Sequence, residues 1–266
     1  AVNKMDLVGY SQDRWDEIVA DYRAFAAEIG LPDFTAIPVS GLRGDNVSEP
    51  SANMGWYQGP TLLRHLEEVP LDDDRLQREA FRMPVQYVNR PSHEFRGFCG
   101  MIASGTVRPG DAVRVLPSGR ISSVSRIVAM DADLDRAIAG RSVTLTLADE
   151  VDCSRGDVLG AAQDPLEIAD QFEASLVWMS EEELLPGRSY LMKIGAATSA
   201  ATVTEIKHQV NVSTLEKKAA KTLELNGIGL VNLALDRAVP FAPYAQGRDL
   251  GGFILIDRIT NATVGA

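Results

Sequence analysis

Cysteine and long apolar runs are scarce in this sequence of 266 residues. Two cysteines, Cys99 and Cys153, are too few for a disulfide framework and lie far apart in the chain. Two reduced, packed thiols in a reducing cytosol are therefore expected. No apolar stretch approaches the length of a membrane-spanning helix, and no secretory signal is visible. We expect a cytoplasmic protein with no membrane partner.

Positive charge is also in short supply. The 26 Lys and Arg residues are outnumbered by 37 Asp and Glu residues, which gives a formal net charge of −11. Because this charge repels nucleic-acid phosphate on average, we expect no nucleic-acid partner. The content of 45% hydrophobic and 24% charged residues is ordinary for a globular protein, and the length allows two or three domains.

A phosphate-binding loop is missing as well. No G-x-x-x-x-G-K-[ST] segment occurs in the chain, and no Asp-x-x-Gly segment precedes Asn3. No residue is therefore expected to cradle phosphates, hold Mg²⁺ or orient an attacking water, and we predict no catalytic and no metal residue. The first residue is Ala rather than Met, which agrees with a truncated chain, a proteolytic product or a missing N-terminal portion.

What the sequence does contain, at its start, is Asn3-Lys4-Met5-Asp6, an Asn-Lys-x-Asp pattern. Guanine has two adjacent donors, its ring N–H and its exocyclic amine, and the Asp6 carboxylate can accept both. Adenine lacks this pair, so binding it would leave a carboxylate unsatisfied at a cost of about 1–3 kcal/mol. The Lys4 stem is expected to lie along one face of the base, and the Asn3 amide to brace the loop. Taken alone, the pattern fits a polar strand-to-loop turn equally well.

A second loop strengthens the guanine hypothesis. Residues 11–30 show helical apolar spacing, with Ser11 as the N-cap and Gly30 as a left-handed C-terminal residue. Residues 34–39 have the composition of a short strand, which ends at Ser40-Gly41-Leu42. Since the loops of an α/β unit meet at the carboxyl ends of its strands, backbone N–H groups in this second loop are expected to approach the guanine carbonyl oxygen. The predicted guanine contacts are Asn3, Lys4, Asp6, Ser40, Gly41 and Leu42.

The segment that follows is a long loop, residues 43–58, which carries Met54, Trp56 and Tyr57. Loops of this length in a compact domain are usually functional or form an interface. Its aromatic residues are expected either to meet a partner subunit or to fold back onto the domain. A helix is predicted to start at residues 59–61, with its leucines as the apolar face and His65 on its solvated side.

Beyond an acidic linker at residues 71–75, the periodicity changes to short alternating strands separated by turn signals, which is typical of β-barrels. Two series of strands are predicted, and the chain is divided into domains at 1–78, 79–165 and 166–266. Turns are expected at Arg108–Asp111 and Pro117–Gly119. Lys217 and Lys218 are assigned to a short helix. The predicted strands are residues 82–89, 98–104, 112–116, 121–130 and 142–147, then 171–178, 190–194, 201–209, 228–235 and 253–257.

Several longer motifs span the chain, at residues 3–8, 38–47, 56–63, 86–91 and 252–261. Together with the order of the three parts, these motifs resemble the translational GTPases of the elongation factor Tu type, and more closely the GTPase (large) subunit of bacterial sulfate adenylyltransferase. Two departures are visible: Gly41 stands where Ala is usual, and the phosphate-binding segments are missing.

The resemblance implies an α/β remnant of a P-loop GTPase domain followed by two β-barrel domains. It also implies GTP as ligand, with Mg²⁺ ligands in the missing N-terminal part, and a heterodimer with a catalytic ATP-sulfurylase (small) subunit. That assembly would couple GTP hydrolysis to the formation of adenosine 5′-phosphosulfate from ATP and sulfate in sulfate assimilation. The fragment alone is expected to be inactive.

Two other functions stay open from the sequence. The first is a translation-factor-type GTPase that binds aminoacyl-tRNA, which the three-domain order favours and the acidic balance opposes. The second is an interaction module that consists only of the two barrels.

Overall fold

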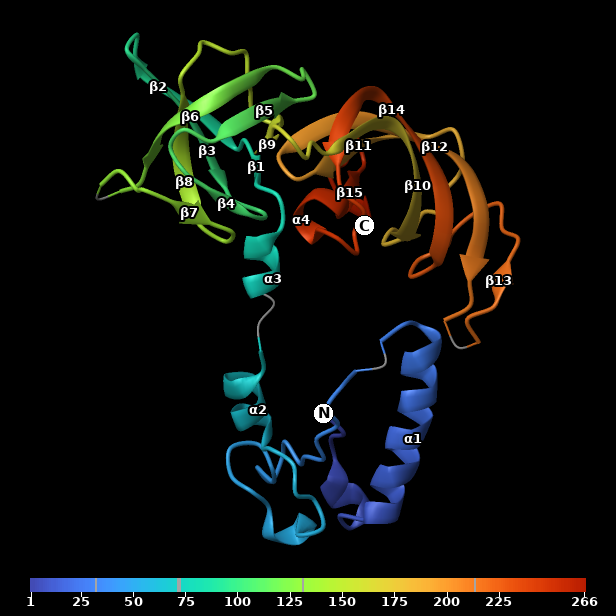
Figure 1. Cartoon of the computed structure of the whole chain (residues 1–266). Coiled ribbons are helices and arrows are strands. Elements are labelled where there is room, and N and C mark those ends of the chain that lie inside the picture. Colours follow the sequence, from blue (N-terminus) through green and yellow to red (C-terminus); the bar gives the residue numbers. More distant parts are fainter. Residues whose placement is uncertain (32, 71–72, 131, 213) are drawn as a thin grey trace. The chain divides into compact units, whose positions relative to one another are not determined.

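A computed structural model of the chain describes residues 1–31, 33–70, 73–130, 132–212 and 214–266. The chain forms two compact units, Ala1–Leu71 and Asp72–Ala266, which are called unit 1 and unit 2 below (Figure 1). Within the described residues, helices that combine the length and the apolar character needed to cross a membrane are not found.

Unit 1 contains the predicted long helix, α1 (Gln12–Glu28). The Ser11 hydroxyl caps it by accepting a hydrogen bond from the Arg14 N–H at 3.3 Å. Gly30, at φ +76°, follows its end in the left-handed conformation that glycine adopts without strain. Both boundary predictions are confirmed.

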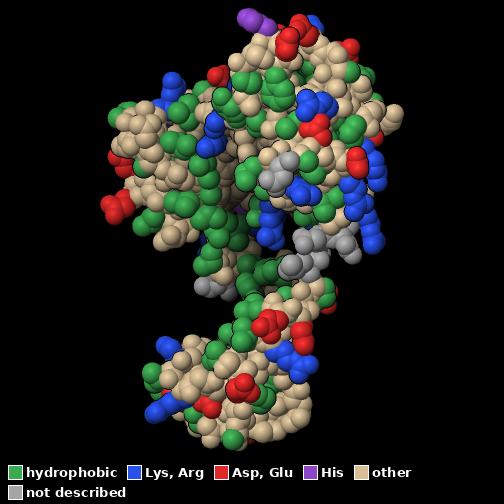
Figure 2. All heavy atoms as spheres, turned by 90° about the vertical axis from the view of Figure 1, so that its left-hand side faces the viewer, with side chains coloured by type: hydrophobic (Ala, Val, Ile, Leu, Met, Phe, Trp, Pro, Cys, Tyr) green, Lys and Arg blue, Asp and Glu red, His purple; other side chains and the backbone are tan. Residues whose placement is uncertain are grey.

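Helical apolar spacing predicts one buried stripe on α1, but the stripe is buried only in part. Val19 and Ala26 are buried, but Tyr22 is 50% exposed and Phe25 is 38% exposed. The short α2 (Leu62–Glu68) is capped by the Thr61 hydroxyl, and none of its residues is buried. Hydrophobic side chains accordingly reach the surface of unit 1 in Figure 2. The physical reason is that the described part of unit 1 supplies no second layer against these faces.

The strand predicted at residues 34–39 is reduced to a single parallel bridge between Val2 and Pro38. The Val2 N–H donates to the Ile37 carbonyl at 2.8 Å, and the Val39 N–H donates back to the Val2 carbonyl at 2.9 Å. Two short 3-10 helices, Met5–Val8 and Ala52–Met54, complete unit 1. The extended segments before the two predicted guanine loops therefore lie side by side and run in the same direction.

Unit 2 begins with α3 (Asp73–Arg78) and continues into the first barrel. Its sheet has the order β1-β9-β5-β6-β8-β3-β2, with a separate pair β4-β7. Antiparallel pairing of Arg82 in β1 with Ser104, just after β3, closes the ring around a core that includes Phe98, Ile127 and Leu145. The strands are β1 (Arg82–Pro84), β2 (Tyr87–Ser92), β3 (Phe95–Met101), β4 (Thr106–Val107), β5 (Ala112–Leu116), β6 (Ile121–Val128), β7 (Ala137–Ile138), β8 (Ser142–Leu147) and β9 (Val158–Ala161).

The second barrel has the strand order β10-β14-β12-β11-β15-β16, with β13 beside β12. It packs Trp178, Tyr190 and Leu255 into a core of its own. Pairing of Trp178 with Gly265 joins the two ends of this sheet. The elements are β10 (Glu167–Val177), β11 (Ser189–Ile194), β12 (Ala197–Val210), β13 (Lys217–Lys218), β14 (Ile228–Phe241), α4 (Arg248–Gly251), β15 (Phe253–Ile256) and β16 (Thr263–Gly265).

The strand predictions agree with most of the barrel strands, with the following exceptions. The segment predicted as one strand at residues 82–89 is two strands, β1 and β2, which pair with different neighbours. Lys217 and Lys218 form β13 rather than a helix, because they pair with Val210 and Gln209 of β12. Strands β4, β7, β9 and β16 were not predicted: all four are short, and glycine interrupts the apolar pattern of β9 and β16. The prediction of two β-barrels is confirmed.

Gly105 allows the first barrel to close against the segment after α3. Its φ is +79°, and a Cβ at this position would lie 2.4 Å from the backbone nitrogen of Phe81. The Gly105 N–H donates to the Leu76 carbonyl at 2.7 Å. Any side chain would therefore combine a strained conformation with an overlap against backbone that cannot move aside.

We predict that Gly105→Ala lowers the free energy of unfolding of unit 2 by about 2–4 kcal/mol, as strain and overlap add. Gly110→Ala is the matched control, since Gly110 has φ +91° but no atom within 4 Å of its built Cβ. The control is expected to lose only about 1 kcal/mol. Urea denaturation of both variants measures the difference, and equal losses would contradict the role of the close approach.

Candidate functional site

The candidate site is formed by two loops at the carboxyl ends of the paired extended segments. The first loop follows Val2 and the second follows Val39. The Met5 N–H donates to the Val39 carbonyl at 3.2 Å, so the pairing continues into the first loop. Residues separated by more than thirty positions in the sequence thus lie at one edge, as ligand-binding loops of α/β units do.

Asn3 joins the two loops directly. Its Oδ1 accepts a hydrogen bond from the Gly41 N–H at 3.0 Å and a second from the Lys4 N–H at 2.7 Å. Lys4 has φ +66° and is exposed, so the chain turns sharply at this residue. The Asn3 amide therefore braces both loops.

Asp6 and Ser40 form the second link. The Ser40 hydroxyl donates to Asp6 Oδ1 at 2.7 Å and accepts from the Arg43 N–H at 3.2 Å. Ser40 is fully buried and Asp6 is half-buried, so the serine is a fixed support for the carboxylate. The hydrogen bond restricts Asp6 while leaving its remaining lone pairs able to accept donors from a ligand.

Gly41 and Leu42 occupy the outer part of the second loop, and Leu42 is 82% exposed. A Cβ built at Gly41 would lie 3.6 Å from the Asn3 amide atoms, which is ordinary van der Waals contact. An alanine would fit at this position, so the glycine is not required by the geometry. All six predicted guanine contacts, Asn3, Lys4, Asp6, Ser40, Gly41 and Leu42, lie in the two adjacent loops.

Asp45 supports the second loop and was not assigned a role from the sequence. Its carboxylate accepts from the Ser51 hydroxyl at 2.6 Å, the Tyr10 hydroxyl at 3.0 Å and the Asn53 amide at 3.2 Å. These hydrogen bonds, the one from Ser51 above all, hold the pKa of Asp45 below its usual range. Burial and the contact with Asp45 raise the pKa of Tyr10. The Gly-Asp-Asn sequence at residues 44–46, which is typical of a turn, is the sequence feature that could have indicated this role of Asp45.

The aromatic residues of the long loop fold back onto unit 1. The Trp56 Nε1–H donates to the Tyr10 carbonyl at 3.1 Å, and the Trp56 and Trp15 ring centroids lie 5.4 Å apart. Met54 is 1% exposed. Of the two alternatives for this loop, the structure therefore supports packing of its aromatic residues against their own unit.

Catalytic and metal-binding groups were not predicted for the chain. Across the residues that the structure describes, groups of three or more His, Cys, Asp or Glu side chains positioned to hold a metal ion are not found. His93 lies exposed at the tip of the β2–β3 hairpin. Cys99 and Cys153 are both free thiols, and burial raises the pKa of Cys153 to about 12. What the two loops offer chemically is a fixed carboxylate and backbone donors, which suit recognition of a base edge.

Two family descriptions match unit 2. Residues 99–160 match "Elongation factor Tu domain 2", and residues 171–266 match "GTP-eEF1A C-terminal domain-like". These segments lie in the first and second barrels, respectively.

Curated relatives match the whole chain at about half identity. The bifunctional enzyme CysN/CysC of Xylella fastidiosa is 53% identical over 267 residues, and sulfate adenylyltransferase subunit 1 of Aliivibrio fischeri is 51% identical over 268 residues. The bifunctional enzyme NodQ of a Rhizobium species is 48% identical over 266 residues. Each match covers 100% of this chain but only 42%, 56% and 41% of those relatives, so the chain spans about half the length of the proteins that it matches.

Among solved structures, Sup35 complexed with GMPPNP matches with a TM-score of 0.67 and 25% sequence identity. The match covers 99% of this chain and 66% of the Sup35 chain. Sup35 is thus similar in fold along both units, at half the identity of the curated relatives.

We predict that Asn3→Ala speeds hydrogen exchange of the Gly41 amide, because the variant removes the acceptor that joins the loops. The loss of one hydrogen bond, about 0.5–1.5 kcal/mol, corresponds to an increase of up to about tenfold. Gln58→Ala is the control, since Gln58 is an exposed residue of the same unit whose amide donates to the Gly55 carbonyl and does not contact the Gly41 N–H. Amide exchange followed by NMR measures both, and an unchanged Gly41 rate would show that Asn3 does not hold the second loop.

Proposed function

The chain belongs to the family of sulfate adenylyltransferase subunit 1, within the translational GTPases, and on that premise we propose that it reads guanine in a GTP-hydrolysing regulatory subunit. The contacts proposed for the base are Asn3, Lys4, Asp6, Ser40, Gly41 and Leu42. The observation that carries this proposal is the pair of hydrogen bonds that join the two loops, Gly41 N–H to Asn3 and Ser40 hydroxyl to Asp6.

The chemistry of the two loops fits a guanine base. Asp6 is held by a buried hydroxyl, which reduces the entropy lost when its carboxylate accepts the ring N–H and the exocyclic amine together. The exposed stem of Lys4 is free to cover one face of the base, and N–H groups of the second loop can meet the guanine carbonyl oxygen. An adenine base would leave the carboxylate without its two donors.

GTP is the ligand that this base recognition implies, with Mg²⁺ as its companion ion. The two loops then form the base site, whereas the phosphates and Mg²⁺ are bound by parts of the complete protein that this chain does not span. The uncovered apolar faces of α1 and α2 support this view, because such stripes are normally buried by a further layer.

We propose the division 1–78, 79–165 and 166–266, in which the first segment belongs to the nucleotide domain and the others are barrel domains. In the complete heterodimer, the catalytic ATP-sulfurylase subunit joins ATP and sulfate into adenosine 5′-phosphosulfate, and this subunit couples that step to GTP hydrolysis. GTP can bias the step only through different affinity for two conformations of the assembly. The barrels are then the parts that respond to the nucleotide domain and hold the partner.

A translation-factor function is less well supported. Sup35 shares the fold at 25% identity, whereas proteins named as sulfate adenylyltransferase subunit 1 share 50–51% identity over the chain. The barrel-only interaction module is disfavoured by the ordered guanine loops in unit 1.

We predict that Asp6→Asn in the complete protein shifts nucleotide preference from guanine toward xanthine. An asparagine keeps one acceptor for the ring N–H and supplies a donor for the second carbonyl of xanthine. GTP binding is expected to weaken about 10- to 100-fold as the charge-assisted pair is lost. Competition between GTP and XTP for the purified protein measures the shift.

Asp13→Asn is the matched control, because Asp13 is an exposed carboxylate in the first turn of α1, outside the two loops. It is expected to leave nucleotide preference unchanged. Unaltered GTP selectivity in Asp6→Asn would remove Asp6 from the site.

A further inference from the structure

A large cavity lies between the two barrels of unit 2. Its walls come from α3 and the segment that leads into β1, from the residues just after β3, and from the loop that joins β14 to α4 (Figure 1). The cavity volume is about 1190 Å³, which is enough for a small organic ligand. All of its lining residues belong to unit 2, so the cavity is distinct from the guanine loops of unit 1.

Arg82 of β1 lines this cavity with a guanidinium group that has few acceptors in the protein. Its side chain is 18% exposed, and its Nε is buried without a hydrogen-bond partner. Its ion-pair partner, Asp164, lies 3.8 Å away and is itself 67% exposed, so the contact is too long for a hydrogen bond. Because a guanidinium carries five N–H donors and a largely buried charge is costly without acceptors, Arg82 requires acceptors from outside the described chain.

Two further arginines bring free donors to the same cavity. Arg78 lies at the end of α3 and Arg248 at the start of α4, and both are exposed. In the part of the chain that the structure describes, neither guanidinium group has a hydrogen bond or an ion pair. Three separate elements, β1, α3 and α4, therefore each supply one arginine whose donors are available to a ligand.

The carboxylates of the cavity leave these donors available. Glu79 forms its ion pair with Arg75, at 2.5 Å. Asp164 and Asp249 are exposed, so water solvates both. Among the described lining residues, four arginines face three carboxylates, a local excess of positive charge in a chain whose net charge is −11. Arg82 is less exposed than its carboxylate neighbours, so its charge is the least screened by solvent.

The other part of the lining is apolar. Ala242 and Leu250 are 8% and 4% exposed and belong to the hydrophobic cluster that joins the two barrels, and Ala103 packs against that cluster. The Tyr244 side chain, in the loop between β14 and α4, is 61% exposed. The cavity thus combines donors for an anion with a surface for a flat organic group.

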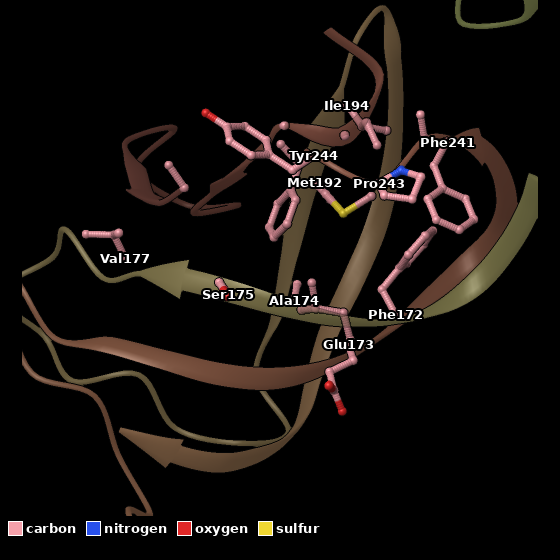
Figure 3. A pocket seen from close by; sticks show the side chains of 16 residues that line it. Phe172, Glu173, Ala174, Ser175, Val177, Met192, Ile194, Phe241, Pro243 and Tyr244 are labelled. Carbon is pink, nitrogen blue, oxygen red and sulfur yellow. The ribbon is translucent and has the colours of Figure 1, made fainter. Parts of the chain in front are cut away.

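The cavity shown in Figure 3 differs in this respect. It lies in the second barrel, has a volume of about 550 Å³ and is lined by apolar side chains such as Phe172 and Phe241. Glu173 provides the one charged side chain among its described lining residues, and that carboxylate pairs with Lys207. An anion would find no cationic side chain there, whereas the cavity between the barrels provides arginines from several elements.

We propose that the cavity between the barrels binds a phosphate or sulfate group carried by a small organic molecule, such as a nucleoside monophosphate. Arg78, Arg82 and Arg248 donate to the oxyanion, since guanidinium groups form strong, charge-assisted hydrogen bonds with phosphate and sulfate oxygens. The organic part lies against Leu250 and Tyr244. Binding satisfies the buried Arg82 Nε–H and connects α3 to α4.

Titration of the full chain with adenosine 5′-monophosphate tests this proposal. Adenine is chosen because the guanine loops are expected to reject it, and sodium chloride keeps the ionic strength constant so that screening does not change. The NMR resonance of the Arg82 Nε–Hε group is expected to shift and to saturate as this group gains an acceptor. Arg248→Gln is expected to raise the Kd about tenfold or more, because a charge-assisted hydrogen bond is lost from an exposed side chain that the fold does not require.

Arg108→Gln is the matched control, since Arg108 is an exposed arginine in the turn before β5 and does not line the cavity. It is expected to leave the Kd unchanged. Equal weakening by both variants, or an Arg82 resonance that saturating nucleotide does not shift, would overturn the proposed site. Inorganic phosphate and inorganic sulfate, titrated separately, test the organic part: if either binds as tightly as the nucleotide, the assignment to an organic ester is wrong.

Discussion

The parallel pairing of Val2 with residues 37–39 is the interaction on which the candidate site depends. It is only one bridge long, yet it places two loops next to each other that are far apart in the sequence. The hydrogen bonds from Gly41 to Asn3 and from Ser40 to Asp6 can form only because this pairing fixes the direction and register of both segments. The base recognition proposed for Asp6 thus depends on this backbone pairing, and the hydrogen bonds of Asp45 support the second loop.

The two barrels do not depend on this pairing. Their closure depends on places where backbone segments approach closely and on a few turns that side-chain hydrogen bonds stabilise. Asp257 illustrates this in the motif at residues 252–261. Its nearly buried carboxylate accepts from the Ile259 and Thr260 N–H groups, both at 2.9 Å, and from Arg188 at 2.6 Å. Those hydrogen bonds, with the Thr260 and Ile259 N–H groups first, lower the pKa of Asp257 to about 2. The acidic residue of the motif is therefore explained by the turn between β15 and β16 and by its ion pair with Arg188, which directly precedes β11. It needs no catalytic role.

Much of the architecture could be predicted from the sequence, because strong local signals carry it. Ser11 and Gly30 bound α1, and the alternating segments locate most barrel strands. The failures have a common physical cause. In each case the outcome depends on a neighbour that is distant in the sequence. Burial of the apolar face of α1 requires a second layer. The segment at residues 82–89 divides into β1 and β2 because its two halves pair with different strands, and β13 forms because it pairs with β12. In the candidate site, the six residues proposed as base contacts were predicted from their motifs, and the structure places them in two adjacent loops. Asp45 was not predicted, because its hydrogen bonds with Tyr10 and Ser51 arise only in three dimensions.

The central claim is that the chain is the guanine-reading and barrel part of a GTPase subunit in sulfate activation. The most direct measurement is the rate of adenosine 5′-phosphosulfate formation by the complete protein mixed with its catalytic partner, with ATP and sulfate fixed, in the presence and absence of GTP. The account predicts a rate that rises with GTP and does not rise when a non-hydrolysable analogue that leaves no hydrolysis product replaces it. A rate independent of GTP in an assembled, active complex would contradict it.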